Sequence, residues 1–364
     1  MNKIIRVLHT EWSDGWGGQE IRIIGEMLAL REQGVEVFLA CRENATIQHK
    51  ALEFQIPVFV LPFKGNTDLG TLLALKKLVK QYQIDIINTH SGKDTWVGGL
   101  AAKLAGIKFI RTRHLSNQIR PNRVNFINEL ADYIFTTGES IRSDMIKLNR
   151  IKTDRIKSIP TGIDTKIYDP SLYDRVTCRK QFNIQKDEIV IGIVAVLRQF
   201  KRHDLFLDMA RSVIDINKDK KFVFLIAGDG PQKDKLIAIA EKYNLTPYVR
   251  FLGHVSKVPE LLTAMDIFVL SSDSKEGVPQ SVMQALLMNK AVVATNCGST
   301  RDLLNNNSFQ LVEVNSKNSL IAGVLHYINR HEDINTREFI KTHFSKEAMV
   351  EKIIKVYKSF CYET

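Results

Sequence analysis

The sequence predicts an α/β protein built from two parallel-sheet units, and three observations support this prediction. Short β-rich runs alternate with helical patterns in the first half, and the alternation restarts after the segment KSIPTGID. The segment 160–175 between the halves carries Pro160, Gly162 and Pro170 among polar residues, which is typical of a linker. A chain of 364 residues with 44% apolar composition is also longer than one such unit needs.

The first unit is expected to span residues 1–170. Helical patterns begin at Gly18 and near residues 68 and 94. In the first of these helices, Ile21, Ile24 and Leu28 share one face, so we expect that face to pack and Arg22 and Glu26 to point elsewhere. The expected strands of this unit are IIRVLHT, VEVFLA, PVFVLP, IDIINTH, KFIRTRH and DYIFTTG.

The second unit is expected to span residues 171–343. Helices are predicted from about residues 203 and 231 and over 280–288. The expected strands of this unit are EIVIGIVAVL, KFVFLIAG, VRFLG, MDIFVLSS, KAVVATN and FQLVEV. Because the strands again alternate with helices, this sheet is also predicted to be parallel.

The formal net charge of +11 indicates an anionic partner, which could be a nucleotide, a nucleic acid, a lipid head group or an acidic glycan. No acidic residue occurs between Asp94 and Glu129. This stretch is either a solvated basic face or a patch that faces phosphates or an anionic membrane. Its basic residues are Lys103, Lys108, Arg111, Arg113, Arg120 and Arg123. Its few aromatic residues are scattered, so we expect no nucleic-acid partner.

Cysteine usage and hydropathy argue against several classes of protein. The four cysteines are too widely spread for a zinc cluster or a disulfide framework. The N-terminal segment is interpreted as a first strand and not as a signal peptide, and no apolar run approaches the ~20 residues of a membrane span. We therefore expect a cytoplasmic protein. The basic stretch adds the hypothesis of peripheral attachment to the cytosolic face of a membrane.

Two segments at strand ends contain residues suited to binding phosphates. WSDGWGGQEIRI places Gly17 and Gly18 between the first strand and its helix, where backbone amides can approach a phosphate; a mere tight turn is the alternative. VLRQFKRHD places Arg198 and Lys201 just beyond a buried strand, where they could bind a diphosphate; an exposed basic loop is the alternative.

A third segment, SSDSKEGVPQSVMQALL, places Glu276 in a loop and Gln284 in the following helix. Both side chains could hydrogen-bond sugar or ribose hydroxyls, although a solvated charge is the alternative for Glu276. Gly277 frees the backbone, and Pro279 can start the helix.

Glu276-Gly277-Val278-Pro279, with a polar residue eight positions after Glu276, resembles the E-x7-E signature of retaining glycosyltransferases with the GT-B fold, in particular family GT4. The likeness runs nearly end to end. It includes Gly17-Gly18-Gln19-Glu20, His90-Ser91 with Asp94, Arg113-His114, Pro160 to Asp164, Arg198 with Lys201, Gly228 to Pro231, and the closing helix Phe344 to Tyr357.

This resemblance implies two facing Rossmann-like domains with an active-site cleft between them, and a C-terminal helix over 344–364 that packs back on the first domain. It implies a retaining hexosyltransferase that moves a sugar from a UDP- or GDP-linked donor to a glycan or lipid-linked glycan, as bacterial surface-polysaccharide and lipopolysaccharide glycosyltransferases do. No cofactor is implied. The chain has no D-x-D pair, so we expect no metal and expect Arg198 and Lys201 to replace it.

The resemblance also implies roles for individual residues. His114, Glu276, Arg198 and Lys201 are implied to be catalytic, with the backbone carbonyl of His114 beside the anomeric carbon. His90, Asp94 and Arg113 are implied to face the acceptor. The donor is implied to be bound by Gly17, Gly18, Arg198, Lys201, Gly230, Glu276, Gly277, Val278, Pro279, Gln280, Ser281 and Gln284.

Three positions depart from the family pattern. Gln284 stands where the second Glu of the signature is usual, Asp302 stands where a Glu usually follows the Gly298 turn, and Arg202 stands where Gly often follows the phosphate-binding Lys. Other functions on the same fold stay open at this point, because architecture does not dictate the reaction. These are a nucleotide-sugar epimerase, a phosphorylase, and a non-catalytic protein that binds a nucleotide sugar or a nucleic acid.

Overall fold

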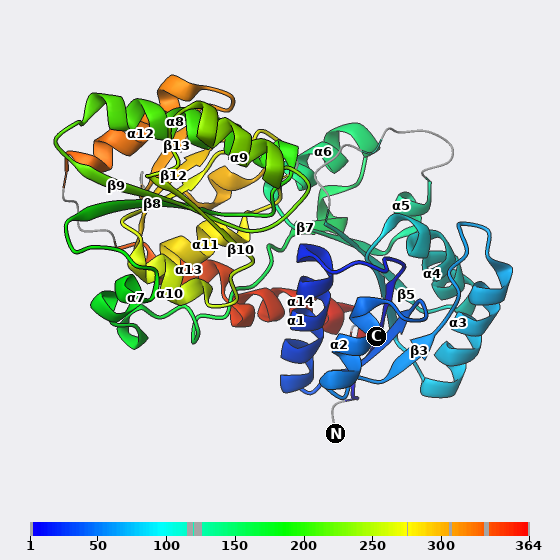
Figure 1. The fold of residues 1–364 in the computed structure, drawn as a ribbon. Coiled ribbons are helices and arrows are strands. Elements are labelled where there is room, and N and C mark those ends of the chain that lie inside the picture. Colours follow the sequence, from blue (N-terminus) through cyan, green and yellow to red (C-terminus); the bar gives the residue numbers. More distant parts are fainter. Residues whose placement is uncertain are drawn as a thin grey trace. The chain divides into compact units, whose positions relative to one another are not determined.

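The structure is a computed structural model that describes residues 3–114, 119, 126–274, 276–305, 308–330 and 335–362. It divides the chain into two compact units. Unit 1 comprises Met1–Gly162 together with Lys346–Thr364, and unit 2 comprises Ile163–Ser345 (Figure 1). Each unit is built around one sheet with helices on both faces.

Unit 1 contains a seven-stranded sheet in the order β3-β2-β1-β4-β5-β6-β7, and every recorded pairing is parallel. Parallel strands that alternate with helices are what the sequence predicts for this half. The strands are β1 (Arg6–Glu11), β2 (Glu36–Cys41), β3 (Val58–Val60), β4 (Ile86–Thr89), β5 (Lys108–Arg113), β6 (Tyr133–Thr136) and β7 (Ile156–Ser158).

Two apolar cores cover the faces of this sheet. The core on one face is formed with α1 (Gly18–Glu32), α2 (Thr46–Glu53) and α14 (Lys346–Tyr362). The core on the other face is formed with α3 (Leu69–Tyr82), α4 (Gly92–Ala105), α5 (Ile127–Leu130) and α6 (Glu139–Asn149).

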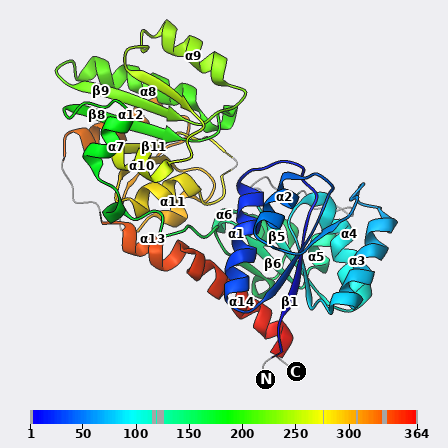
Figure 2. The same cartoon turned by 60° about the horizontal axis from the view of Figure 1, so that its bottom comes forward.

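The buried face of α1 differs from the one predicted from the sequence. Ile24 is buried as predicted, at 4% exposure, but Ile21 is 46% exposed. Arg22 and Glu26 are buried and form an ion pair at 3.4 Å. The reason is α14, which lies beside α1 in Figures 1 and 2 and covers the side of α1 expected to face solvent. Arg22 Nη1 also donates to the carbonyl of Ile159 at 2.7 Å, so the guanidinium crosslinks α1 to the segment after β7.

The stretch without acidic residues is not a uniform basic surface. Arg111 and Arg113 lie on β5 and are buried, at 3% and 9% exposure. Lys103 forms an ion pair with Asp132 at 2.8 Å. Arg120 and Arg123 lie outside the described residues. The buried arginines therefore cannot serve in a membrane-facing patch, because their guanidinium groups face the interior of the unit.

Unit 2 contains a six-stranded parallel sheet in the order β10-β9-β8-β11-β12-β13. This order corresponds to 3-2-1-4-5-6, the strand order of Rossmann folds. The strands are β8 (Glu188–Val194), β9 (Lys221–Ala227), β10 (Val249–Gly253), β11 (Ile267–Leu270), β12 (Ala291–Thr295) and β13 (Gln310–Val312).

Helices cover both faces of the second sheet as well. One core is formed with α8 (His203–Ile216), α9 (Lys233–Lys242) and α12 (Lys317–Ile328). The other core is formed with α7 (Arg175–Gln181), α10 (Val258–Ala264), α11 (Gln280–Leu287) and α13 (Arg337–Phe344).

The boundary between the units lies at Gly162/Ile163, eight residues before the expected one at 170/171. The segment that follows Ile163 belongs to unit 2 because Arg337 of α13 donates to the carbonyl of Thr165 and pairs with Asp169. The helix α14 belongs to unit 1 and packs on α1. In the part of the chain that the structure describes, every helix is too short or too polar to span a membrane.

The strand orders define where ligands are expected. In each sheet the order reverses once, between β1 and β4 in unit 1 and between β8 and β11 in unit 2. In open α/β sheets, ligands bind outside the carboxyl ends of the strands at such switch points. The residues at these two edges are therefore the first to consider for a functional site.

Candidate active site

Lys201 and Glu276 form an ion pair at the switch point of unit 2. Lys201 ends the short 3-10 helix after β8, and Glu276 lies in the loop after β11, 75 residues further along the chain. Both side chains are largely buried, at 16% and 9% exposure. Ser272 Oγ donates to Glu276 Oε1 at 2.7 Å, so a lysine and a serine hold the same carboxylate oxygen. The structure thus brings together two of the predicted catalytic residues.

The loop that carries Glu276 rests on Gly298. This glycine has a φ of +55°, and a Cβ added to it would lie 1.9 Å from the carbonyl oxygen of Glu276. Ser299 N also donates to the carbonyl of Gly277 at 3.2 Å. Only glycine permits this close approach, because any side chain would displace the backbone of Glu276.

The loop that carries Arg198 is held by the glycine turn after β9. Leu197 N donates to Asp229 O at 2.9 Å, and Gln232 N donates to Leu197 O at 3.1 Å. Gly230, a predicted donor-binding residue, has a φ of +155° and lies against the backbone of Leu197. Gly230 therefore positions the loop that carries Arg198.

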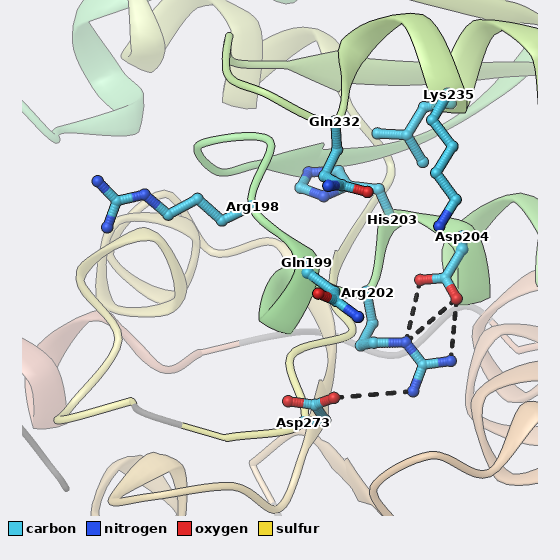
Figure 3. Close-up of a pocket in the computed structure, with 9 residues that line it drawn as sticks. Arg198, Gln199, Arg202, His203, Asp204, Gln232, Lys235 and Asp273 are labelled. Carbon is cyan, nitrogen blue, oxygen red and sulfur yellow. Dashed lines mark hydrogen bonds and ion pairs between the residues drawn. The ribbon is translucent and has the colours of Figure 1, made fainter.

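A polar cavity of about 240 Å³ lies beside this loop at the beginnings of α8 and α9. Figure 3 shows that the exposed Arg198 side chain points away from the ion pair of Arg202 with Asp204. His203 lies at the cavity wall, where burial and the nearby Lys201 lower its pKa to about 4. The cavity is lined by Arg198, Gln199, Arg202, His203, Asp204, Gln232, Lys235, Leu236 and Asp273.

The structure accounts for Arg202, which stands where glycine often follows the phosphate-binding lysine. Its φ is +50°, a left-handed conformation that favours glycine. The guanidinium pairs with Asp204 at 3.0 Å and with Asp273 at 3.8 Å. These ion pairs offset the strain of an arginine at this position, which is of the order of 1 kcal/mol.

The remaining predicted donor residues follow Glu276 into α11. The side chain of Val278 is 6% exposed and belongs to the apolar core, so only its backbone can face a ligand. Pro279 precedes the first residue of α11, and Gln284 is partly exposed within that helix. Gly277, Gln280 and Ser281 are also partly exposed.

In unit 1 the structure brings His90 and His114 together at the carboxyl edge of the sheet, beside the switch point between β1 and β4. His90 directly follows β4, and His114 directly follows β5. Their ring nitrogens, Nδ1 of His90 and Nε2 of His114, lie 2.9 Å apart. The other nitrogen of His90, Nε2, lies 2.9 Å from His9 Nδ1. His9 lies on β1 and is fully buried, and burial lowers its pKa to about 3.

Asp94 caps the helix α4. It is fully buried, and its carboxylate accepts from Thr10 Oγ1 at 2.7 Å, from His90 N at 2.9 Å and from Ser91 N at 2.8 Å. Both carboxylate oxygens are therefore bonded to the protein. These contacts are those of a capping box, which fixes the backbone of His90.

The remaining predicted site residues of unit 1 differ in their exposure and in their contacts. Gly17 precedes α1, and its amide donates to Glu20 Oε2 at 2.8 Å. Gly18 is exposed as the first residue of α1. Arg113 is buried, and burial together with the neighbouring Arg111 lowers its pKa to about 10.

Two further buried polar residues lie on β1, His9 and Glu11, and neither is predicted from the sequence as a site residue. Glu11 is fully buried; its carboxylate accepts from Ser13 N at 2.7 Å and from Gln19 Nε2 at 2.6 Å. Burial and the charge of Asp94 raise the pKa of Glu11 to about 8. The sequence feature that could have indicated these two residues is the polar run His9-Thr10-Glu11 at the end of an otherwise apolar strand. In the described part of the chain, no three His, Cys, Asp or Glu side chains are grouped to hold a metal ion.

Known sequences match both halves of the chain. The Glycosyltransferase Family 4 model matches residues 16–167, and the Glycosyl transferases group 1 model matches residues 174–342. The Escherichia coli UDP-Gal:alpha-D-GlcNAc-diphosphoundecaprenol alpha-1,3-galactosyltransferase is 24% identical over 339 residues, which cover 88% of this chain and 87% of the relative. The Campylobacter jejuni N,N'-diacetylbacillosaminyl-diphospho-undecaprenol alpha-1,3-N-acetylgalactosaminyltransferase is 29% identical over 306 residues, covering 76% and 77% of the two chains.

The fold matches a solved structure over nearly the whole chain. Anabaena HepE in complex with UDP and glucose superposes with a TM-score of 0.81 at 19% identity, covering 98% of this chain and 100% of that one. This likeness establishes the fold, and the family matches to the two halves establish the lineage. The chain therefore belongs to the GT-B glycosyltransferases of the family 4 and group 1 type.

Proposed function

We propose that this protein is a retaining, metal-independent hexosyltransferase that transfers a sugar from a UDP-linked donor to a lipid-linked glycan in surface-polysaccharide or lipopolysaccharide synthesis. The observation that carries the proposal is the pairing of Lys201 with Glu276 at the switch point of unit 2. Two relatives named for sugars on diphosphoundecaprenol support the acceptor class, and the UDP in HepE supports the donor base. A GDP-linked donor is the alternative.

In this proposal, the second unit binds the donor diphosphate through Arg198 and Lys201. The leaving nucleoside diphosphate gains negative charge as the glycosidic bond breaks, and fixed cations that meet this charge lower the barrier. Arg198 can bind two phosphate oxygens, and Lys201 supplies a compact charge. These two side chains take the part that a divalent ion plays in other glycosyltransferases.

Glu276 is proposed to orient the transferred sugar. Its contacts with Lys201 and Ser272 both use Oε1. The other oxygen, Oε2, is then the one to accept from a sugar hydroxyl. Gln284 is proposed to bind the ribose through its amide oxygen, which accepts more weakly than the usual carboxylate. The backbone carbonyl of His114 is proposed to face the positive charge at the anomeric carbon.

The test of the proposal is nucleotide release from purified protein given UDP- and GDP-sugars with a diphosphoprenyl-linked sugar acceptor. Arg198→Ala and Lys201→Ala are expected to lower turnover by one to a few orders of magnitude, about the loss of one transition-state contact. Lys218→Ala is the matched control, because Lys218 is exposed and lies just before the amino end of β9, at the opposite edge of the sheet. Equal turnover in all three variants would reject the assignment of the two cations.

The same reaction separates the rival functions. A transferase requires the acceptor and yields a product whose anomeric configuration matches the donor. An epimerase instead converts the nucleotide sugar alone. A phosphorylase requires inorganic phosphate, and a non-catalytic binder shows none of these reactions. Inversion at the anomeric carbon would refute the retaining mechanism while leaving the transferase assignment in place.

A lipid-linked acceptor implies that the enzyme works at the cytosolic face of a membrane. The net charge of +11 supports attraction to anionic head groups, at about 1 kcal/mol for each basic residue near the surface. Co-sedimentation with liposomes, with and without anionic lipid, tests this part of the proposal. Equal partitioning in both samples would reject it.

A further inference from the structure

Three imidazoles form a hydrogen-bonded column across the carboxyl edge of the first sheet. His9 lies on β1, His90 follows β4, and His114 follows β5, so the column crosses three adjacent strands. The nitrogen atoms of each neighbouring pair are 2.9 Å apart, and the ring centroids of each pair are 5.2 Å apart. His9 and His90 are buried, and His114 is the partly exposed end of the column.

The three rings are neutral at physiological pH. Burial lowers the pKa of His9 to about 3. It also lowers the pKa of His90 and His114 well below the ordinary value, and the positive charges of Arg22 and Arg111 act in the same direction. Because the three rings carry no charge, the property of the column that can vary is the direction of its hydrogen bonds.

The column can exist in only two arrangements. A neutral imidazole has one N–H donor and one acceptor nitrogen, so both shared bonds must run in the same direction. One direction leaves an N–H at His9 Nε2, and the other leaves an acceptor lone pair there. His9 Nε2 is buried and has no hydrogen-bond partner among the described residues. Orphaned buried N–H groups are rarer than under-satisfied acceptors, which favours the lone pair at His9 Nε2.

With that choice, every proton position in the column follows. His9 Nδ1–H donates to His90 Nε2, and His90 Nδ1–H donates to His114 Nε2. His114 must then carry its own proton on Nδ1. His114, the partly exposed end of the column, thus carries a donor at the carboxyl edge of the sheet, one strand away from the switch point between β1 and β4.

We propose that His9 and His90 are positioning residues that fix His114 in the Nδ1–H tautomer, so that its side chain donates a hydrogen bond to a hydroxyl of the sugar substrates. The role in catalysis rests on the proposed glycosyltransferase function. The column is not a proton wire, because a wire needs an exit at its far end. Among the described residues, none accepts a proton from His9 Nε2.

Two substitutions of His9 test the proposal against a purely structural role. His9→Phe keeps an aromatic ring but removes the donor to His90. His9→Asn places an amide N–H at the same bond distance from the backbone as Nδ1 and so restores the donor. The exposed His49 on α2 supplies the control substitution His49→Phe.

The first measurement is nitrogen NMR of protein labelled on its nine histidines, with the His114 signals assigned through a His114→Gln variant. The wild-type protein should show His114 protonated on Nδ1. His9→Phe should populate the other tautomer at His114, and His9→Asn should restore the wild-type pattern. A wild-type His114 protonated on Nε2, or a tautomer unchanged in His9→Phe, would overturn the proposal.

The second measurement is turnover. His9→Phe should lower kcat roughly ten-fold, the effect of one lost hydrogen bond, with the KM for the nucleotide sugar unchanged and with His9→Asn near wild type. An equal loss in His9→Phe and His9→Asn would show a structural role only and refute the positioning role. If the tautomers behave as expected but the wild-type protein transfers no sugar, the proposed function fails and the tautomer assignment stands.

Discussion

Replacing Gly298 by alanine tests whether the placement of Glu276 controls the reaction. The new Cβ would lie 1.9 Å from the carbonyl oxygen and 2.7 Å from the carbonyl carbon of Glu276. Real Cβ atoms essentially never come closer than 3.0 Å to a non-bonded heavy atom, so the backbone of Glu276 must move by roughly 1 Å. The obstacle is backbone and cannot rotate away as a flexible side chain would.

The size of the effect follows from that displacement. A misplacement of about 1 Å at a catalytic group costs on the order of 100-fold in rate, or about 2.7 kcal/mol of transition-state stabilisation. The left-handed φ of +55° adds about 1–2 kcal/mol of strain to the folded state. Gly298→Ala should therefore lower kcat/KM about 100-fold and also lower the melting temperature.

Gly106→Ala is the matched control, because Gly106 has a φ of +72° with nothing within 4 Å of its added Cβ. It should lose similar stability but keep its turnover per folded molecule. The assay is UDP release at saturating acceptor, corrected by the folded fraction from circular dichroism. If the two variants lose turnover equally, or if Gly298→Ala keeps wild-type turnover, the link between the Gly298 turn and the Glu276 loop is refuted.

Two further predictions concern buried charges in unit 1. The raised pKa of Glu11, about 8 against an ordinary 4.5, means that the folded protein holds a proton which the unfolded chain has released, so stability falls as the pH rises from about 4.5 to about 8. Glu11→Gln should lose less stability than wild type between about pH 6 and about pH 8 in thermal melts, and identical pH profiles would contradict this. Arg22→Met leaves Glu26 as an uncompensated buried charge and should cost about 3–5 kcal/mol in urea unfolding, whereas Arg22→Met with Glu26→Leu should recover most of it. If the free energy of unfolding of Arg22→Met alone lies within about 1 kcal/mol of the wild-type value, the ion pair contributes little to stability.

Much of the fold follows from local sequence patterns. The helix expected near 68–82 is α3, Leu69–Tyr82, because its apolar positions repeat at helical spacing and Asp68 caps its first turn. The strand runs are short and apolar, and they alternate with helices, which requires parallel sheets. The positions of Lys201 and Glu276 follow from the same reasoning, since both come after strands whose carboxyl ends share one edge.

The rest depends on partners that are distant in the sequence. The spacing within α1 gives no sign that α14 will cover Arg22, because that helix lies more than 300 residues further along the chain. The histidine column likewise depends on the adjacency of β1, β4 and β5, which alternation alone does not specify. The sequence therefore predicts His9 only as a residue of the first strand. It predicts His90 and His114 as site residues with separate roles.

The return of α14 to unit 1 has a consequence for biosynthesis. Unit 2 is one continuous stretch, Ile163–Ser345, so its fold needs no segment from elsewhere in the chain. Unit 1 stays without part of its core until α14 has been synthesised, since Met349, Ile353 and Tyr357 come from that helix. Unit 2 can thus fold without α14, whereas unit 1 cannot complete its core before the last residues of the chain have been synthesised. Until then unit 1 exposes the apolar surface that α14 later covers, and such surface is prone to aggregation during folding.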